Sequence, residues 1–268
     1  MPRLLAMALL LAAGAAGRQT AAQQGGQGPQ VNLVLSFFGG VADGHELWSV
    51  SRQPVLVLGT SSTYDTMALS RAATSGFTAG LSATYYGGGP FGWYAELAYA
   101  EHPLDDGCTV VSAAPDPSND ELCQSIRAES HGGGVVSLSG GVSVRATRRG
   151  WVIPYVRGGI GISSYSSSTV EVAGFFTESG VIRERVIIAD NDARRLSPNA
   201  VVAAGLAAVI GTGYQLRLEL RDVLTSETVL TGAADALGRG PTDTRLSHHL
   251  SLTIGLDVVL ERKRGRRY

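Results

Sequence analysis

Apolar and polar side chains alternate along an eleven-residue stretch near the end of the sequence, and few folds accommodate such a pattern. The stretch runs from Leu250 to Leu260 and reads L-S-L-T-I-G-L-D-V-V-L, with Val259 as the one exception to the pattern. A period of two residues is typical of a β-strand with one apolar and one polar face. The length also matches the roughly 9–11 tilted residues with which a strand crosses a bilayer.

Seven further stretches show the same alternation, although the alanine-rich sixth of the eight would by itself also fit a helix. Its neighbours favour a strand, because the turn Gly211-Thr212-Gly213 leads directly into another alternating stretch. The eight predicted strands are Val31 to Ala42, Ala73 to Tyr86, Phe91 to His102, Gly133 to Thr147, Trp151 to Ser164, Asn199 to Ile210, Tyr214 to Arg221 and Leu250 to Leu260.

The connections between these strands alternate between short and long. Three are tight turns of three or four residues, at 87–90, 148–150 and 211–213, and four are long and polar, at 43–72, 103–132, 165–198 and 226–246. Outer-membrane barrels sort their connections in this way, with short periplasmic turns and long outer loops. Strands in lipid must also close on themselves, because an open edge would leave backbone groups unpaired. The sequence therefore predicts an all-β fold, an eight-stranded antiparallel up-and-down transmembrane β-barrel over residues 31–260.

Composition excludes two other classes of protein. The 268 residues carry a formal net charge of −1 and are 17% charged, which fits neither a disordered chain nor a nucleic-acid-binding one. Past the first twenty residues no apolar run reaches the length of a transmembrane helix. The 35 glycines suit tight turns and a narrow barrel interior.

The two ends of the chain are expected to lie outside the barrel. Residues 1–22 have the short positive start, the apolar stretch and the small residues of an export signal, and the apolar stretch is too short for a single-span anchor. Residues 23–30 form a polar leader, and residues 261–268 form a tail with five Lys or Arg. The tail either contacts anionic lipid headgroups or is simply solvated.

The two cysteines agree with export to an oxidising compartment. Cys108 and Cys123 lie in one polar segment, and closing a loop of this length contributes about 3 kcal/mol in the chain-entropy model. The sequence predicts a loop disulfide. Metal binding is the alternative, but no third ligand is convincingly placed, so no metal site and no cofactor are expected.

Strand parity predicts which charged side chains point into the barrel. Eight strands enclose a lumen just wide enough for side chains to fill, so buried charges must pair there. The sequence predicts either an ion-pair network that plugs the lumen or a narrow aqueous path, formed by Glu96, Arg145, Arg157, Arg217, Glu219, Arg221 and Asp257. Aromatic residues beside the tight turns predict a periplasmic girdle of Tyr85, Tyr86, Phe91, Trp93, Trp151 and Tyr214.

The chain resembles the small eight-stranded outer-membrane barrel family, the OmpA-like and OmpX-like group of Gram-negative bacteria. The stretches that carry the resemblance are P-Y-V-R-G-G-I-G-I from Pro154, Y-Q-L-R-L-E-L-R from Tyr214, and the final alternating stretch from Leu250. The resemblance implies a place in the bacterial outer membrane with both termini in the periplasm. It also implies contact with outer-membrane lipids and lipopolysaccharide, and insertion by the barrel-assembly machinery.

These observations predict a monomeric, non-enzymatic protein with a structural or surface-interaction role through its long loops. The third long loop contains two apolar segments around Glu178-Ser179-Gly180, which predict strands five and six continuing above the membrane as a hairpin. Three alternatives stay open: a narrow channel for small solutes, a lipid-A-modifying enzyme, and a secreted soluble ligand-binding barrel. The enzyme would have to use the His/Ser cluster of Ser247, His248, His249 and Ser251.

Overall fold

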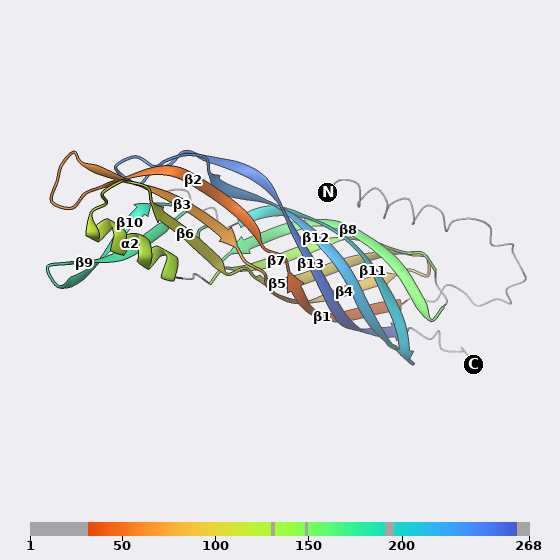
Figure 1. Cartoon of the computed structure of the whole chain (residues 1–268). Coiled ribbons are helices and arrows are strands. Elements are labelled where there is room, and N and C mark those ends of the chain that lie inside the picture. Colours follow the sequence, from red (N-terminus) through yellow and green to blue (C-terminus); the bar gives the residue numbers. More distant parts are fainter. Residues whose placement is uncertain (1–31, 130–131, 148–149, 191–195, 262–268) are drawn as a thin grey trace, which may run out of the picture.

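The protein consists of a long β-barrel with a smaller domain at one of its ends, as seen in a computed structural model (Figure 1). The structure describes residues 32–129, 132–147, 150–190 and 196–261. The predicted export signal, the polar leader and nearly all of the basic tail lie outside these residues.

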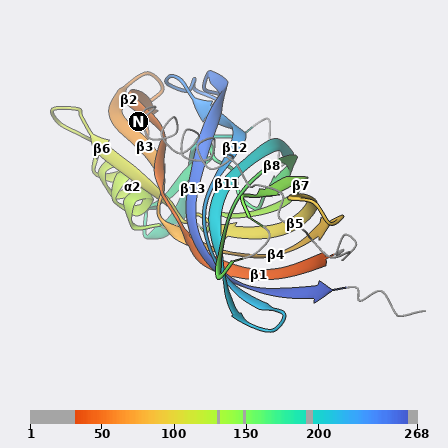
Figure 2. The same cartoon turned by 90° about the vertical axis from the view of Figure 1, so that its right-hand side faces the viewer.

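Eight antiparallel strands form the closed barrel in the order β1-β13-β12-β11-β8-β7-β5-β4. The first and last strands close it, with Leu35 opposite Val258 and Phe37 opposite Leu256. Most of the other strands can be followed around the barrel in Figure 2. The strands are β1 (Asn32–Ala42), β4 (Gly76–Tyr86), β5 (Phe91–Glu101), β7 (Gly134–Arg145), β8 (Val152–Tyr165), β11 (Leu196–Gly211), β12 (Tyr214–Leu230) and β13 (Thr242–Glu261).

The predicted eight-stranded barrel is thus confirmed, and the main difference lies in the length of its last strands. β12 continues nine residues beyond Arg221 to Leu230, and β13 begins at Thr242 rather than Leu250. These extensions pair with each other, for example Glu227 with Arg245. The turns β4–β5, β7–β8 and β11–β12 meet at one end of the barrel, here called the turn end. The long connections leave from the opposite end, here called the mouth.

The outer surface of the barrel is apolar and the inner surface is polar. On β13, Leu252, Ile254 and Leu256 are 41–56% exposed, whereas the intervening Thr253 is 1% exposed. A continuous band of exposed apolar side chains is stable only against hydrocarbon, so the barrel is a transmembrane one. Within the described part of the chain, no helix is both long enough and apolar enough to cross a membrane.

The long connections at the mouth fold into a domain of their own, here called the cap (Figure 1). It contains a three-stranded sheet in the order β2-β3-β6, a helix and a two-stranded hairpin. Their bounds are β2 (His45–Leu56), β3 (Tyr64–Ala73), β6 (Leu104–Val110), α2 (Pro117–Ala128), β9 (Val172–Glu178) and β10 (Val181–Ile188). The sequence predicted polar loops here. That prediction fails because short apolar runs, too brief to show a period, meet in one shared core.

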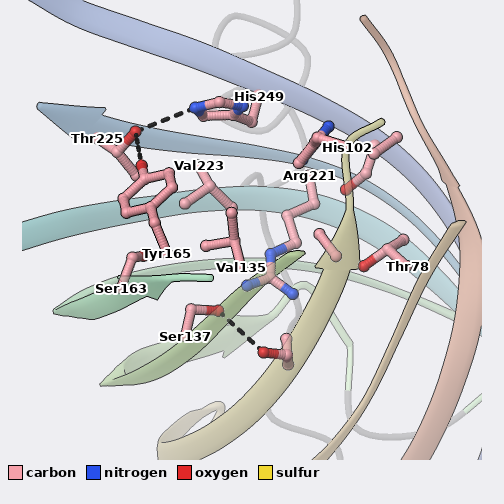
Figure 3. A pocket seen from close by; sticks show the side chains of 14 residues that line it. Thr78, His102, Val135, Ser137, Ser163, Tyr165, Arg221, Val223, Thr225 and His249 are labelled. Carbon is pink, nitrogen blue, oxygen red and sulfur yellow. Dashed lines mark hydrogen bonds between the residues drawn. The ribbon is translucent and has the colours of Figure 1, made fainter. Parts of the chain in front are cut away.

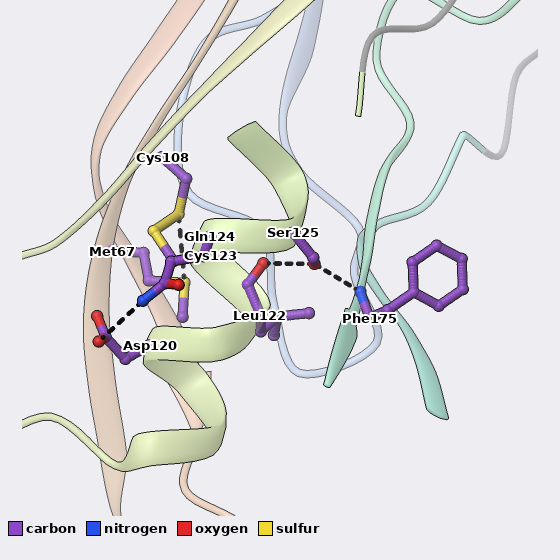
Figure 4. The surroundings of a disulfide bond; sticks show 8 residues. All are labelled: Met67, Cys108, Asp120, Leu122, Cys123, Gln124, Ser125 and Phe175. Carbon is purple, nitrogen blue, oxygen red and sulfur yellow. Dashed lines mark hydrogen bonds between the residues drawn. A yellow bond between two sulfur atoms is a disulfide. The ribbon is translucent and has the colours of Figure 1, made fainter. Parts of the chain in front are cut away.

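The cap core is apolar and contains the predicted disulfide. Met67, Leu122 and Ile188 are fully buried in it, together with the extended end of β12 at Leu230. The disulfide between Cys108 and Cys123 is confirmed and joins β6 to α2, with the two Cα atoms 5.4 Å apart (Figure 4). The cap is therefore fixed to the barrel by continuous strands and held together internally by burial and by a covalent link.

Helix α2 has a capped start and a buried face. The Asp116 carboxylate accepts a hydrogen bond from the backbone amide of Ser118, and Pro117 occupies the start of the helix, as is typical of an N-terminus. Leu122 and Ile126 face the core, and the Ser125 hydroxyl accepts from the backbone amide of Phe175 on β9 (Figure 4). The helix therefore packs directly on the hairpin.

The predicted hairpin forms, but not as an extension of the barrel. Among the described residues, β9 and β10 pair only with each other. They turn at Ser179 and Gly180, whose φ angles are 52° and 78°. β8 ends at Tyr165, before the hairpin begins. The prediction of continuous strands is wrong because the hairpin packs instead on the apolar face of α2, where Leu122 and Ile126 share a core with Phe176.

Candidate functional site

The middle of the barrel is filled by a cluster of buried charged side chains. Glu96 of β5 lies 2.5 Å from the Arg157 guanidinium of β8 and 2.7 Å from that of Arg221 on β12. Arg157 also pairs with Glu219, whose other oxygen accepts a hydrogen bond of 2.7 Å from the Tyr155 hydroxyl. Two carboxylates thus meet two guanidiniums across the lumen, and the cluster is compensated in charge, as buried ions require.

Glycines make room for this cluster. A Cβ at Gly205 would lie 2.6 Å from the Tyr155 hydroxyl, and one at Gly80 would lie 2.5 Å from the Phe38 ring. Arg217 and Arg221 both lie over that Phe38 ring, at 5.1 and 5.8 Å from its centroid. Larger residues at these glycine positions would fill the lumen. The glycines therefore leave the space that the aromatic rings and the guanidiniums occupy.

The other predicted inward charges lie nearer the turn end. Arg217 and Asp257 are both buried, with 3.7 Å between the guanidinium and the carboxylate. Arg145 is half-buried, and its guanidinium lies 3.7 Å from the centroid of the Tyr86 ring. The structure thus places inside the barrel all the charged residues that parity selects: Glu96, Arg145, Arg157, Arg217, Glu219, Arg221 and Asp257.

The predicted aromatic girdle needs one correction. Five of its members are 48–75% exposed on the outer surface near the turn end, namely Tyr85, Phe91, Trp93, Trp151 and Tyr214. Tyr86, however, is 5% exposed, and its hydroxyl lies 2.9 Å from that of Ser143 inside the lumen. The reason is strand parity: Tyr86 follows the outward Tyr85 directly, so its side chain must point to the opposite face.

Above the ion pairs, a small cavity lies at the mouth of the barrel (Figure 3). Its volume is about 40 Å³, and Arg221, His102 and His249 are among the residues that line it. In Figure 3 the Thr225 hydroxyl links the Tyr165 hydroxyl to His249, at 2.8 and 3.0 Å. This volume holds a few water molecules and nothing larger.

Three histidines and one glutamate meet where the mouth contacts the cap. Glu227 of β12 lies 3.0 Å from Nε2 of His249 on β13 and 3.4 Å from Nε2 of His45, the first residue of β2. The rings of His45 and His102 lie 4.9 and 5.3 Å from the ring of His249. Burial, assisted by His249 and His45, lowers the pKa of His102 to about 4, so this imidazole is neutral at pH 7. We call these four residues the mouth cluster.

The sequence indicated one member of the mouth cluster. His249 stands out beside His248, Ser247 and Ser251, but the side chain of His248 is 63% exposed and pairs with Asp222. Glu227 and His45 are 182 residues apart, and no spacing rule connects them. One signal was available, because Glu227 has the same parity as Glu219 and Arg221 once β12 is continued past its predicted end.

Comparison with known proteins gives likenesses of fold. No family model matches the chain, and no curated protein matches its sequence. The structure of Neisserial surface protein A is 11% identical with a TM-score of 0.42, over 85% of this chain and 96% of that one. The outer membrane protein OprG from Pseudomonas aeruginosa is 11% identical with a TM-score of 0.44, over 85% and 95%. Ail, the attachment invasion locus protein of Yersinia pestis, is 10% identical with a TM-score of 0.36, over 86% and 99%.

Proposed function

We propose that the chain is an integral, non-enzymatic protein of a bacterial outer membrane, in which the barrel anchors the cap at the cell surface. In this proposal both termini lie in the periplasm, the apolar band contacts lipid and lipopolysaccharide, and the barrel-assembly machinery inserts a monomer. The cap then carries the interaction with the surroundings. The proposal rests on one observation: charged side chains fill the lumen beneath a cap that packs around its own apolar core.

The lumen supports an anchoring role because charged side chains cross it at its middle. Glu96, Arg157 and Glu219 come from three different strands, and each is at most 5% exposed. A solute that passed through the lumen would have to separate these ion pairs and leave buried charges without partners. Breaking one buried pair costs about 3–5 kcal/mol. We therefore favour the plug over the narrow channel.

Planar bilayer recordings test this choice. The purified barrel is expected to give no steady conductance above the lipid background, and Arg157→Ala or Arg217→Ala is expected to introduce leakage by opening the lumen. Steady, ion-selective conductance of the unmodified protein, changed by either substitution, would instead establish the channel.

The geometry of the mouth cluster supports a non-enzymatic role. A hydroxyl nucleophile needs its base on one imidazole nitrogen and an orienting carboxylate on the other. Here the Thr225 hydroxyl and the Glu227 carboxylate both lie 3.0 Å from Nε2 of His249. Mass spectra of lipid A from cells with and without the protein are expected to be identical. A modified lipid A that disappears in His249→Ala would overturn the proposal.

The orientation is tested by tagging both ends of the barrel. A short epitope inserted between β2 and β3, at residues 57–63, is expected to bind antibody on intact cells. The same epitope in the β11–β12 turn, at residues 212–213, is expected to bind only after the cells are permeabilised. The reverse pattern would place the cap in the periplasm and end its role as a surface domain.

A further inference from the structure

Two histidines and one glutamate of the mouth cluster are residue types that bind transition-metal ions. Glu227 is 4% exposed, and His45 and His249 present their Nε2 atoms to its two oxygens. The ligand atoms of these three residues all lie within 4.8 Å of one another.

The distances suit a shared ion. Zinc binds imidazole nitrogen and carboxylate oxygen at roughly 2.0–2.2 Å, so two ligand atoms on one tetrahedral ion stand about 3.3 Å apart. The Nε2 atom of His45 lies 3.4 Å from Oε2 of Glu227, and that of His249 lies 3.0 Å from Oε1. Small rotations of the side chains would bring an ion into contact with all three.

We propose that His45, Glu227 and His249 form a binding site for one divalent transition-metal ion at the mouth of the barrel. Two imidazoles and one carboxylate are a known ligand set for zinc with an open fourth position. Imidazole nitrogen also favours zinc over magnesium and calcium, which prefer oxygen ligands. The cavities beside the cluster, which Glu227 and His249 help to line, leave room for a water molecule as the fourth ligand.

The ion would join the two parts of the protein. His45 begins the first strand of the cap, whereas Glu227 and His249 belong to the paired extensions of β12 and β13. A metal bridge between them fixes the cap over the mouth at a point where the chain passes from one domain to the other. The site therefore stabilises the position of the cap, and it does not depend on whether the cap binds a partner.

Calorimetric titration of the untagged full-length protein in detergent micelles with zinc tests the site. One zinc ion per chain is expected to bind, and His45→Gln and His249→Gln are each expected to weaken the affinity at least tenfold. His248→Gln is the matched control, because this neighbouring histidine points outward to Asp222. It is expected to bind zinc like the unmodified protein. Titration with cobalt is expected to give the strong visible absorption of a tetrahedral ion, which both cluster variants lose.

Heat-modifiable gel migration shows whether each variant retains its folded barrel. His45 lies in the cap, so His45→Gln still tests the site if a change within β13 disturbs folding. The proposal is overturned if the unmodified protein binds no zinc in a saturable way. It is equally overturned if folded His45→Gln retains the full affinity, or if His248→Gln loses as much affinity as the cluster variants.

Discussion

The barrel and the cap are built from the same chain with opposite arrangements of polar and apolar side chains. In the barrel, Glu219 is 1% exposed inside while Leu218 on the same strand is 49% exposed outside. In the cap, Met67 and Leu122 are fully buried, and polar residues such as Asp120 lie at the surface. The surrounding solvent accounts for this contrast, since hydrocarbon takes up the apolar side chains of one region and water drives those of the other together.

Both regions nevertheless contain buried ion pairs, and the surroundings of these pairs differ between the cap and the barrel. In the cap, Arg71 binds both oxygens of Asp106 at 2.6 Å and also donates to the backbone oxygen of Ser168. Both carboxylate oxygens of this pair are hydrogen-bonded, which lowers the cost of burying it beside an apolar core. In the barrel, the charges form a chain from Arg221 through Glu96 and Arg157 to Glu219. Removing one member of this chain leaves its neighbours buried with fewer partners of opposite charge.

The largest effect is therefore expected from Glu96→Ala. The substitution leaves Arg157 and Arg221 buried without their shared carboxylate, and it is expected to lower the free energy of unfolding by about 3–5 kcal/mol. Denaturant unfolding in micelles, followed by gel migration, measures the change. The cap is expected to unfold with the barrel, because β12 and β13 run through both regions.

Glu178→Ala is the matched control for that measurement. Glu178 pairs with Arg183 on the exposed β9–β10 hairpin, where both side chains meet water. Surface pairs contribute little, so this variant is expected to unfold like the unmodified protein. If both glutamate substitutions have equal effects, the lumen charges do not hold the barrel together.

The second prediction separates the cap from the barrel. Leu122→Ala removes a fully buried side chain from the cap core and is expected to destabilise the cap by about 2–5 kcal/mol. The barrel is expected to keep its heat-modifiable migration, because no barrel pairing depends on α2. Limited proteolysis is expected to cut the cap and spare the barrel. Val181→Ala, at a residue 57% exposed on β10, is expected to leave the digestion pattern unchanged.

The barrel and the cap also differ in how much of their structure the sequence predicts. Period-two alternation located seven of the eight barrel strands and the inward charges, because a lipid-facing strand must alternate, and the alanine-rich sixth strand was identified from its neighbours. Proximity to a turn predicts the wrong face for Tyr86, whereas strand parity predicts the inward face that the structure shows. The cap was missed because Leu47, Trp48 and Leu69 occur in short runs, and their shared core arises only when distant segments meet.

The sequence does not predict the mouth cluster, because its residues come from an unpredicted strand extension and from the cap. Glu227 lies on a strand whose extension the sequence did not reveal, and His45 belongs to the cap. The disulfide, in contrast, was predictable, because two cysteines in one predicted loop have few other partners. Local constraints could thus be inferred from the sequence, and contacts across the barrel–cap boundary could not.

The third prediction concerns the covalent link in the cap. Replacing both Cys108 and Cys123 by serine opens a link over 15 residues, and the chain-entropy model gives a loss of about 3 kcal/mol in cap stability. Reductant is expected to reproduce this loss in the unmodified protein and to have no further effect on the double variant. Protease sensitivity of the cap gives the measurement. A loss that extends to the barrel would show that the two regions do not unfold separately.

The smallest effect is expected from acid, and in the cap it involves Asp65. Burial disfavours the charge of Asp65, but hydrogen bonds from Asn119, the Asp116 amide and Ser112 outweigh it and lower the pKa of this carboxyl below 3.8. In the unfolded cap the carboxyl regains its ordinary pKa. Its contribution to stability is therefore fully present above pH 4 to 5 and is lost as the pH falls through the lower, folded pKa.

Protease resistance of the cap is accordingly expected to stay constant from pH 7 to pH 5 and to decline below pH 4, at which an acid-active protease such as pepsin is the probe. Asp65→Asn removes the titrating group and is expected to weaken the cap at pH 7 while making its stability less dependent on pH. The Asp65 carboxylate joins β3 to the start of α2, through hydrogen bonds of 2.9 Å to the Asp116 amide and 2.8 Å to Asn119. If acid weakens Asp65→Asn as strongly as the unmodified protein, another carboxyl governs the transition, and the link between β3 and α2 does not set the acid limit of the cap.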